Sequence, residues 1–88
     1  DSYFYCVEVR KMGNYPVIDP VATGINIDGM RRAAGYSVAA MAEYFGFATT
    51  NAIYKWIHGT SMPTLDNVMA LSMLFGVSVN DIVVMKKG

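Results

Sequence analysis

Two side chains in the middle of the chain have the chemistry to recognise nucleic acid. Asn51 carries an amide with a donor and an acceptor, which is the pair that adenine presents in the major groove. Lys55, four residues later, carries a charge that suits a phosphate. Each also has an ordinary alternative, since Asn51 could bond its own backbone in a first helical turn and Lys55 could be a solvated surface residue. The elements that carry these residues therefore decide between the two interpretations.

The remaining chemistry-bearing residues do not assemble into a catalytic or metal site. Cys6 is the only cysteine and His58 the only histidine, so neither a disulfide within the chain nor a Cys/His metal cluster can form. The acidic residues are scattered, and His58 is placed as a structural residue near a helix end. We expect no enzyme, no metal and no cofactor. A single cysteine fits a reducing cytosol. A membrane-spanning helix needs about 20 consecutive apolar residues, and because the sequence has no such run we expect no membrane partner.

The composition indicates one folded domain with little charge. Of 88 residues, 53% are hydrophobic and 16% are charged, so part of the surface should be apolar and a second copy could cover it. Seven basic and seven acidic side chains cancel, which does not favour phosphate binding. Residues 25–60 nevertheless sum to one positive charge and are the only net positive third.

Residues 37–59 predict two short helices joined by a glycine turn. Ser37 is a good N-cap, so the first helix should begin at Val38, with Met41 and Phe45 on one face and Gly46 at its end. Thr49 or Thr50 should cap the second helix. Its inward positions are Ile53, Trp56 and Ile57, with Trp56 in the core rather than serving as a stacking platform; Thr50, Asn51, Tyr54 and Lys55 then point outward. This is the layout of a helix-turn-helix.

Further helices are expected on both sides of this motif. One should run from Ile25 to near Gly35, capped by Thr23 or Asn26. Another should follow Thr64 as the central packing helix, and Ser78 with Asp81 should cap a last short helix. The inward residues expected in the helix after Thr64 are Leu65, Val68, Leu71, Leu74 and Phe75.

The segment before the first helix differs from the rest in the residue types it contains. Residues 3–9 are rich in aromatic and β-branched types, and Gly13-Asn14 is a turn signal, which together favour a strand or loose hairpin. The alternative is an irregular arm, because Pro16 and Pro20 each remove a backbone donor.

Residues 25–84 resemble the Cro and phage-repressor type of helix-turn-helix regulator. The residues that carry the resemblance are GMRRAAGYSVAAMAEYFGF, the stretch from AIYKWIHG to the Met62-Pro63-Thr64-Leu65 run, and the ending GVSVNDIV. The resemblance implies an all-α, five-helix lambda-repressor-like bundle that usually binds operator DNA as a dimer. The domain would span residues 25–85, after an N-terminal arm or strand at 1–24 and before a tail at 86–88. Two departures stand out: Val38 replaces a frequent glutamine, and the turn between Gly46 and Ile53 is one residue longer than usual.

The sequence therefore predicts a cytoplasmic, homodimeric regulator that binds double-stranded DNA specifically. Thr50, Asn51 and Tyr54 would face bases, and Lys55, Thr60, Ser61 and Arg31 would hold phosphates. The complete set of expected DNA-contacting residues is Thr49, Thr50, Asn51, Tyr54, Lys55, Thr60, Ser61 and Arg31. The alternative function is a protein-interaction module, antitoxin-like or accessory, in which DNA contact has weakened.

Overall fold

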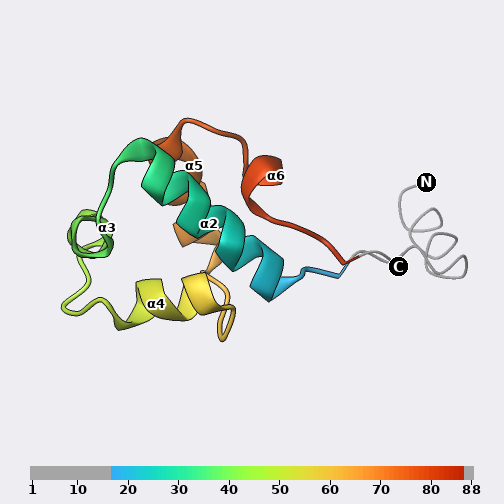
Figure 1. Ribbon diagram of the computed structural model, residues 1–88, viewed down its shortest axis with the longest axis horizontal. Coiled ribbons are helices and arrows are strands. Elements are labelled where there is room, and N and C mark those ends of the chain that lie inside the picture. Colours follow the sequence, from blue (N-terminus) through green and yellow to red (C-terminus); the bar gives the residue numbers. More distant parts are fainter. Residues whose placement is uncertain (1–16, 87–88) are drawn as a thin grey trace, which may run out of the picture.

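The computed structural model describes residues 17–86, which form a bundle of helices (Figure 1). The helices are α2 (Pro20–Ala34), α3 (Val38–Phe45), α4 (Asn51–His58), α5 (Leu65–Phe75) and α6 (Val79–Ile82). The all-α fold predicted from the sequence is thereby confirmed. The strand or hairpin expected at residues 3–9 lies outside the described residues.

Helix α2 begins five residues earlier than the sequence indicated. Asp19 is its N-cap, with a carboxylate oxygen that accepts from the amide of Ala22 at 3.1 Å. Pro20 occupies the first helical position, where its missing N–H is no loss and its fixed φ suits the helix. The expected start at Ile25 was therefore wrong, and α2 crosses the boundary expected between residues 24 and 25. Its predicted end is confirmed by Gly35, which has a φ of 82°.

Neither of the residues expected to cap the first helix does so. Thr23 is buried, and its hydroxyl accepts from the amide of Val84 at 2.9 Å. The amide group of Asn26 donates to the carbonyl of Asp81 at 3.0 Å and to that of Ile82 at 3.3 Å. Both side chains therefore tie α2 to the end of the chain, far away in sequence.

The other helix starts follow the capping residues seen in the sequence. Ser37 accepts from the amide of Ala40 at 3.0 Å, and Thr64 accepts from that of Asn67 at 3.4 Å. Ser78 and Asp81 form a reciprocal capping box at the start of α6. These local hydrogen bonds confirm the predicted beginnings of α3, α5 and α6.

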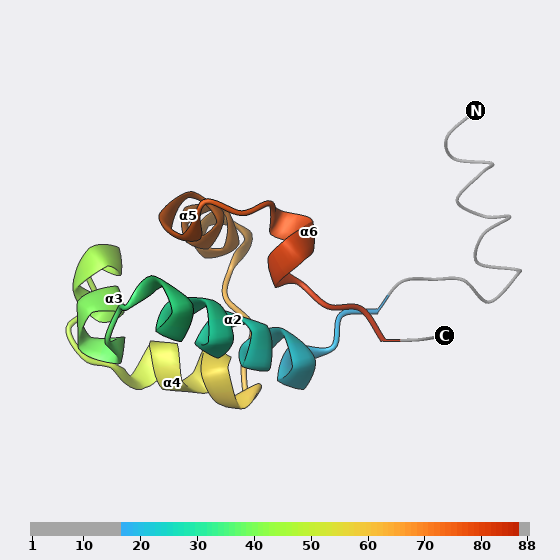
Figure 2. The same cartoon turned by 45° about the horizontal axis from the view of Figure 1, so that its top comes forward.

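Helix α2 is the central element of the bundle. It packs against α4 on one side and against α5 and α6 on the other (Figure 2). The approach to α4 is very close, because a Cβ built on Gly24 would lie 2.3 Å from the carbonyl oxygen of Trp56. The expectation that α5 would be the central packing helix was wrong. Helix α2 contacts α4, α5 and α6, whereas α5 contacts mainly α2 and α6.

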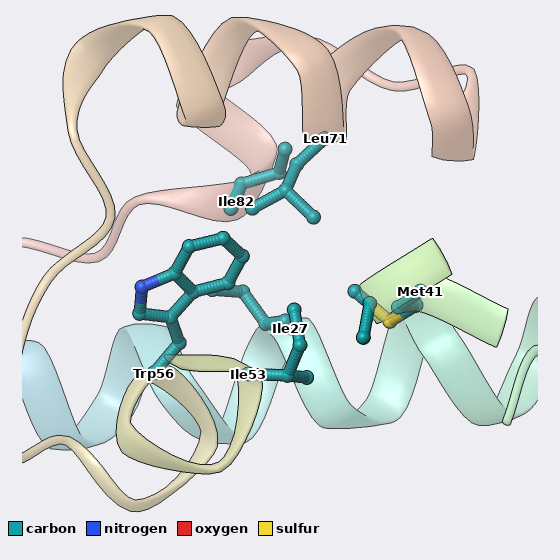
Figure 3. Packing of buried hydrophobic residues seen from close by; sticks show 7 residues of the cluster. Ile27, Met41, Ile53, Trp56, Leu71 and Ile82 are labelled. Carbon is teal, nitrogen blue, oxygen red and sulfur yellow. The ribbon is translucent and has the colours of Figure 1, made fainter. Parts of the chain in front are cut away.

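The core is formed by side chains from every helix. Trp56 points from α4 toward Leu71 and Ile82, Ile27 and Ile53 lie beside it, and Met41 of α3 lies at the far side of the same cluster (Figure 3). Of the core residues expected on α5, Val68 and Leu71 are buried, and Leu74 and Phe75 pack against the core in part. Leu65 was wrongly placed there: it is 72% exposed.

The two ends of the described chain lie side by side. Ile18 and Met85 form an isolated antiparallel bridge, flanked by hydrogen bonds of 2.7 Å from Asp19 N to Val84 O and from Lys86 N to Val17 O. The start of α2 is thereby fixed to the segment after α6.

Candidate nucleic-acid interface

Helices α3 and α4 form the two arms of the expected helix-turn-helix. Gly46 ends α3 with a φ of 75°, a left-handed conformation that favours glycine. The following residue, Phe47, turns inward, where its ring stacks on Phe45 at 5.4 Å and meets Trp56 edge-on at 5.8 Å. Sequence reasoning missed this contact, because Phe47 lies in a turn and has no helical period to mark it. The long turn is therefore anchored to the core by its own aromatic side chain.

The inward side of α4 is fixed by its apolar residues. Ile53 and Trp56 are buried, and Ile57 packs against the core in part. The ring of Trp56 also meets Phe45 edge-on at 5.3 Å, which adds a directional contact between α3 and α4. The rotation of α4 predicted from the sequence is confirmed.

The outward side of α4 carries most of the residues expected to contact DNA. Asn51, Tyr54 and Lys55 are exposed, and the helix begins at Asn51. Thr50 is half-buried at the N-cap position and makes no side-chain cap, whereas the hydroxyl of exposed Thr49 accepts from the amide of Asn51 at 3.3 Å. The structure thus brings these five residues together at the first turns of α4.

An aromatic pair extends this surface toward the end of α4. The rings of Tyr54 and His58 stack at a centroid distance of 6.0 Å and an interplanar angle of 22°. Tyr54, which was expected to face bases, therefore lies beside an imidazole on the exposed side of α4. Sequence reasoning treated His58 alone, although its spacing of four from Tyr54 is the signal that pairs them on one helix face.

The loop after α4 adds two hydroxyl groups at the far end. Thr60 and Ser61 are exposed, and both of their amides donate to the carbonyl of Lys55, at 3.0 Å and 3.4 Å. The hydroxyl of Thr60 donates to the same carbonyl at 3.2 Å. The end of α4 is closed by these bonds, which position both residues beside it.

Arg31 differs from the other expected phosphate ligands. Its side chain is only 14% exposed, and its Nη2 lies 2.7 Å from a carboxylate oxygen of Asp28. Its Nη1 donates to the carbonyl of Tyr36 at 2.9 Å. The hydrogen bonds from Arg31 are the first cause that lowers the pKa of Asp28, and a smaller contribution comes from Arg32. The guanidinium is therefore engaged inside the domain, where it joins α2 to the start of α3.

The surface next to the start of α4 is a shallow hollow. Ala39 and Ala40 of α3 line it together with Thr49 and Thr50, and all four side chains are small. Glu43 is the one charged lining residue. Val38, which departs from the usual glutamine, packs against the core instead of facing outward.

Residues 17–86 lack the features of two other kinds of site. In this range no helix has the length and apolar character needed to span a bilayer. Within the same residues, no group of three or more His, Cys, Asp or Glu side chains could hold a metal ion.

Comparison with known proteins identifies the same motif. A helix-turn-helix family model matches residues 29–82, which is more than half of the chain. No curated protein and no solved structure matches the chain. The matched range begins within α2, at Gly29, includes all of α3, α4 and α5, and ends at the last residue of α6. The chain belongs to the helix-turn-helix family of Cro and phage-repressor type, a family of DNA-binding transcription regulators.

Proposed function

We propose that this domain binds a specific double-stranded DNA sequence through α4 and regulates transcription by occupying an operator. One observation carries the proposal: Asn51, Tyr54 and Lys55 are exposed together on one side of α4. The opposite side is anchored in the core by Trp56. A recognition helix needs this combination, because base contacts require polar side chains held at a fixed orientation.

The proposed contacts fall into two groups. Thr50, Asn51 and Tyr54 would face base edges from the first turns of α4. Lys55 would hold a phosphate. The other exposed hydroxyl groups near the two ends of α4 would contact the DNA backbone; they belong to Thr49, Thr60 and Ser61. Arg31 is reassigned to a positioning role, since its nitrogens already bond Asp28 and Tyr36.

The salt dependence of duplex binding tests this function. With so few basic side chains near α4, the logarithm of the affinity should fall with the logarithm of salt at a slope equivalent to about two to four phosphates per subunit. Fluorescence anisotropy with a labelled duplex measures the slope. Selection from a random pool of duplexes should enrich one sequence. Absence of duplex binding even at low salt would refute the proposal.

A protein-interaction module is the second candidate, and specific features favour it. Lys55 is the only lysine or arginine of α4, and Glu43 adds a negative charge to the hollow that Thr49 and Thr50 line. Val38 offers no polar group to the DNA backbone. In this case α3 and α4 would bind another protein, and affinity for duplex would be absent or independent of its sequence.

A further inference from the structure

An apolar groove lies at the end of the bundle where the two ends of the described chain meet. Its volume is about 480 Å³, and it is lined by the loop after α4, the start of α5, α6 and the paired chain ends. Among the described residues that line it, Asn80 is the only polar one and none is charged. Leu65 at the rim is 72% exposed, and Ile18 and Met85 are also exposed. The groove therefore suits an apolar occupant rather than an ion or a nucleic acid.

Residues 1–16 join the described part of the chain at this groove. Ile18, the second described residue, is itself one of the lining residues. Hydrogen bonds of 2.7 Å pair its neighbours Val17 and Asp19 with the segment after α6 (Figure 1). In an antiparallel pair of this kind the N–H and C=O of Ile18 point the other way, and within residues 17–86 neither has a backbone partner. The backbone beside the groove is therefore open to one more strand.

Residues 3–9 have the side-chain pattern of a strand with one apolar face. Successive side chains of a strand point to opposite faces. One face of such a strand would carry only aliphatic and aromatic side chains, those of Tyr3, Tyr5, Val7 and Val9. The other face would carry Phe4, Cys6 and Glu8. The first face matches the uncharged lining of the groove, and a strand of this pattern is stable only where its apolar face is covered.

We propose that residues 3–9 of the same chain occupy this groove as a strand, with Tyr5 and Val7 packed against its apolar lining. Residues 10–17 form the link, and eight residues can span up to about 26 Å, with Gly13-Asn14 as a place for the chain to turn back. A link of this length holds the segment at an effective concentration on the order of millimolar, which favours it over a second copy. The docked strand covers apolar surface that other proteins could otherwise bind. It leaves α4 free, because none of the residues proposed to contact DNA lines the groove.

A spin label on Cys6 tests the docking by nuclear magnetic resonance, in the full chain and without DNA. Cys6 is the only cysteine, and it belongs to the face opposite Tyr5, so a nitroxide there leaves the docked face unchanged. The label should broaden the amide signals of Leu65, Val79 and Met85 while sparing those of α3, which lies at the opposite end of the bundle (Figure 1). Absence of this contrast would overturn the proposal. So would broadening in a mixture of spin-labelled chains at natural isotope abundance with isotope-labelled chains that carry no nitroxide, because a second copy would then be the occupant.

Two matched pairs of substitutions separate the docked face from its surroundings. Tyr5→Glu should lower the docked fraction about tenfold or more, because its carboxylate would have to leave water for an uncharged groove. Phe4→Glu places the same charge on the opposite face and should leave the broadening unchanged. On the groove side, Leu65→Glu should release the segment, whereas Met73→Glu should not, since Met73 is 79% exposed on the same helix and does not line the groove. The remaining amide signals of α2–α6 check that each variant is folded. Equal effects within either pair would overturn the proposal, and because no DNA is present these outcomes are independent of duplex binding.

Discussion

Asn51 and Lys55 lie four residues apart on the exposed side of α4, yet their removal should have different effects. Base contacts carry sequence information, whereas phosphate contacts carry mainly affinity. Asn51→Ala should cost about 1 to 3 kcal/mol on the preferred duplex and little on a scrambled one. Lys55→Ala should weaken both duplexes alike and reduce the salt slope by about one.

Anisotropy titrations of both variants against the preferred and scrambled duplexes, at two salt concentrations, measure these effects. The two variants control for each other, because both positions are exposed and neither contributes to the core. If Lys55→Ala changed base preference while Asn51→Ala weakened both duplexes equally, the assigned roles would have to be exchanged.

Asp28 should give the domain a stability that depends on pH. Hydrogen bonds from Arg31, with a smaller contribution from Arg32, lower its pKa from the ordinary value of 3.8 in the folded state. A depressed carboxyl pKa stabilises the fold at pH values above 3.8, and this contribution is lost as the pH falls through the folded-state pKa. Asp28→Asn should therefore lower the free energy of unfolding at pH 7, and the difference from wild type should shrink at pH 3. Urea unfolding at both pH values measures this, and an equal difference at each would contradict it.

At the scale of elements, the contact between α2 and α4 depends on one glycine. A Cβ on Gly24 would lie 2.3 Å and 2.5 Å from the carbonyl oxygens of Trp56 and Ile57, which belong to backbone and cannot rotate away. Gly24→Ala should therefore force the helices apart and cost about 1 to 3 kcal/mol, despite the better helix propensity of alanine.

Gly29→Ala provides the control on the same helix. It has no neighbour within 4 Å of the built Cβ, so the substitution should stabilise the domain by up to about 1 kcal/mol. Thermal and urea unfolding of both variants measure the contrast. A stabilised Gly24→Ala variant would show that α2 and α4 do not approach as closely as described.

At the scale of the whole molecule, Trp56 is the residue on which the helices converge. It is 4% exposed and lies in one cluster with Ile27, Met41, Leu71 and Ile82. Trp56→Ala should cost about 3 to 5 kcal/mol, which can exceed what a domain of this size has to lose.

The tryptophan itself reports the packing without any substitution. Its emission should be blue-shifted in the native protein and move to the red in a single step with the loss of helical circular dichroism. A red, readily quenched emission in the native protein would instead place Trp56 at the surface.

Local chemistry allowed the sequence by itself to determine most helix boundaries. Ser37 and Ser78 cap through bonds that span three residues, and Gly46 and Gly59 end helices through their own positive φ. The rotation of α4 was also predictable, since the spacing of Ile53 and Trp56 fixes which side turns inward. Asn51 and Lys55 could therefore be placed on the exposed side before the fold was known.

Only the tertiary structure decided what depends on residues far apart in the chain. Thr23 can be buried because its hydroxyl accepts from the amide of Val84. Gly24 is needed because the backbone carbonyl of Trp56 lies against it. Neither partner can be found from the local sequence of α2. The charge of Arg31 suits a phosphate, but in the folded domain its guanidinium bonds the carboxylate of Asp28 and the carbonyl of Tyr36. Leu65 stands roughly 120° around the helix from Leu71, at the edge of the apolar stripe, so its exposure depends on which elements cover α5. Sequence periodicity gives the faces of a helix, whereas the arrangement of neighbouring helices decides which of them is covered.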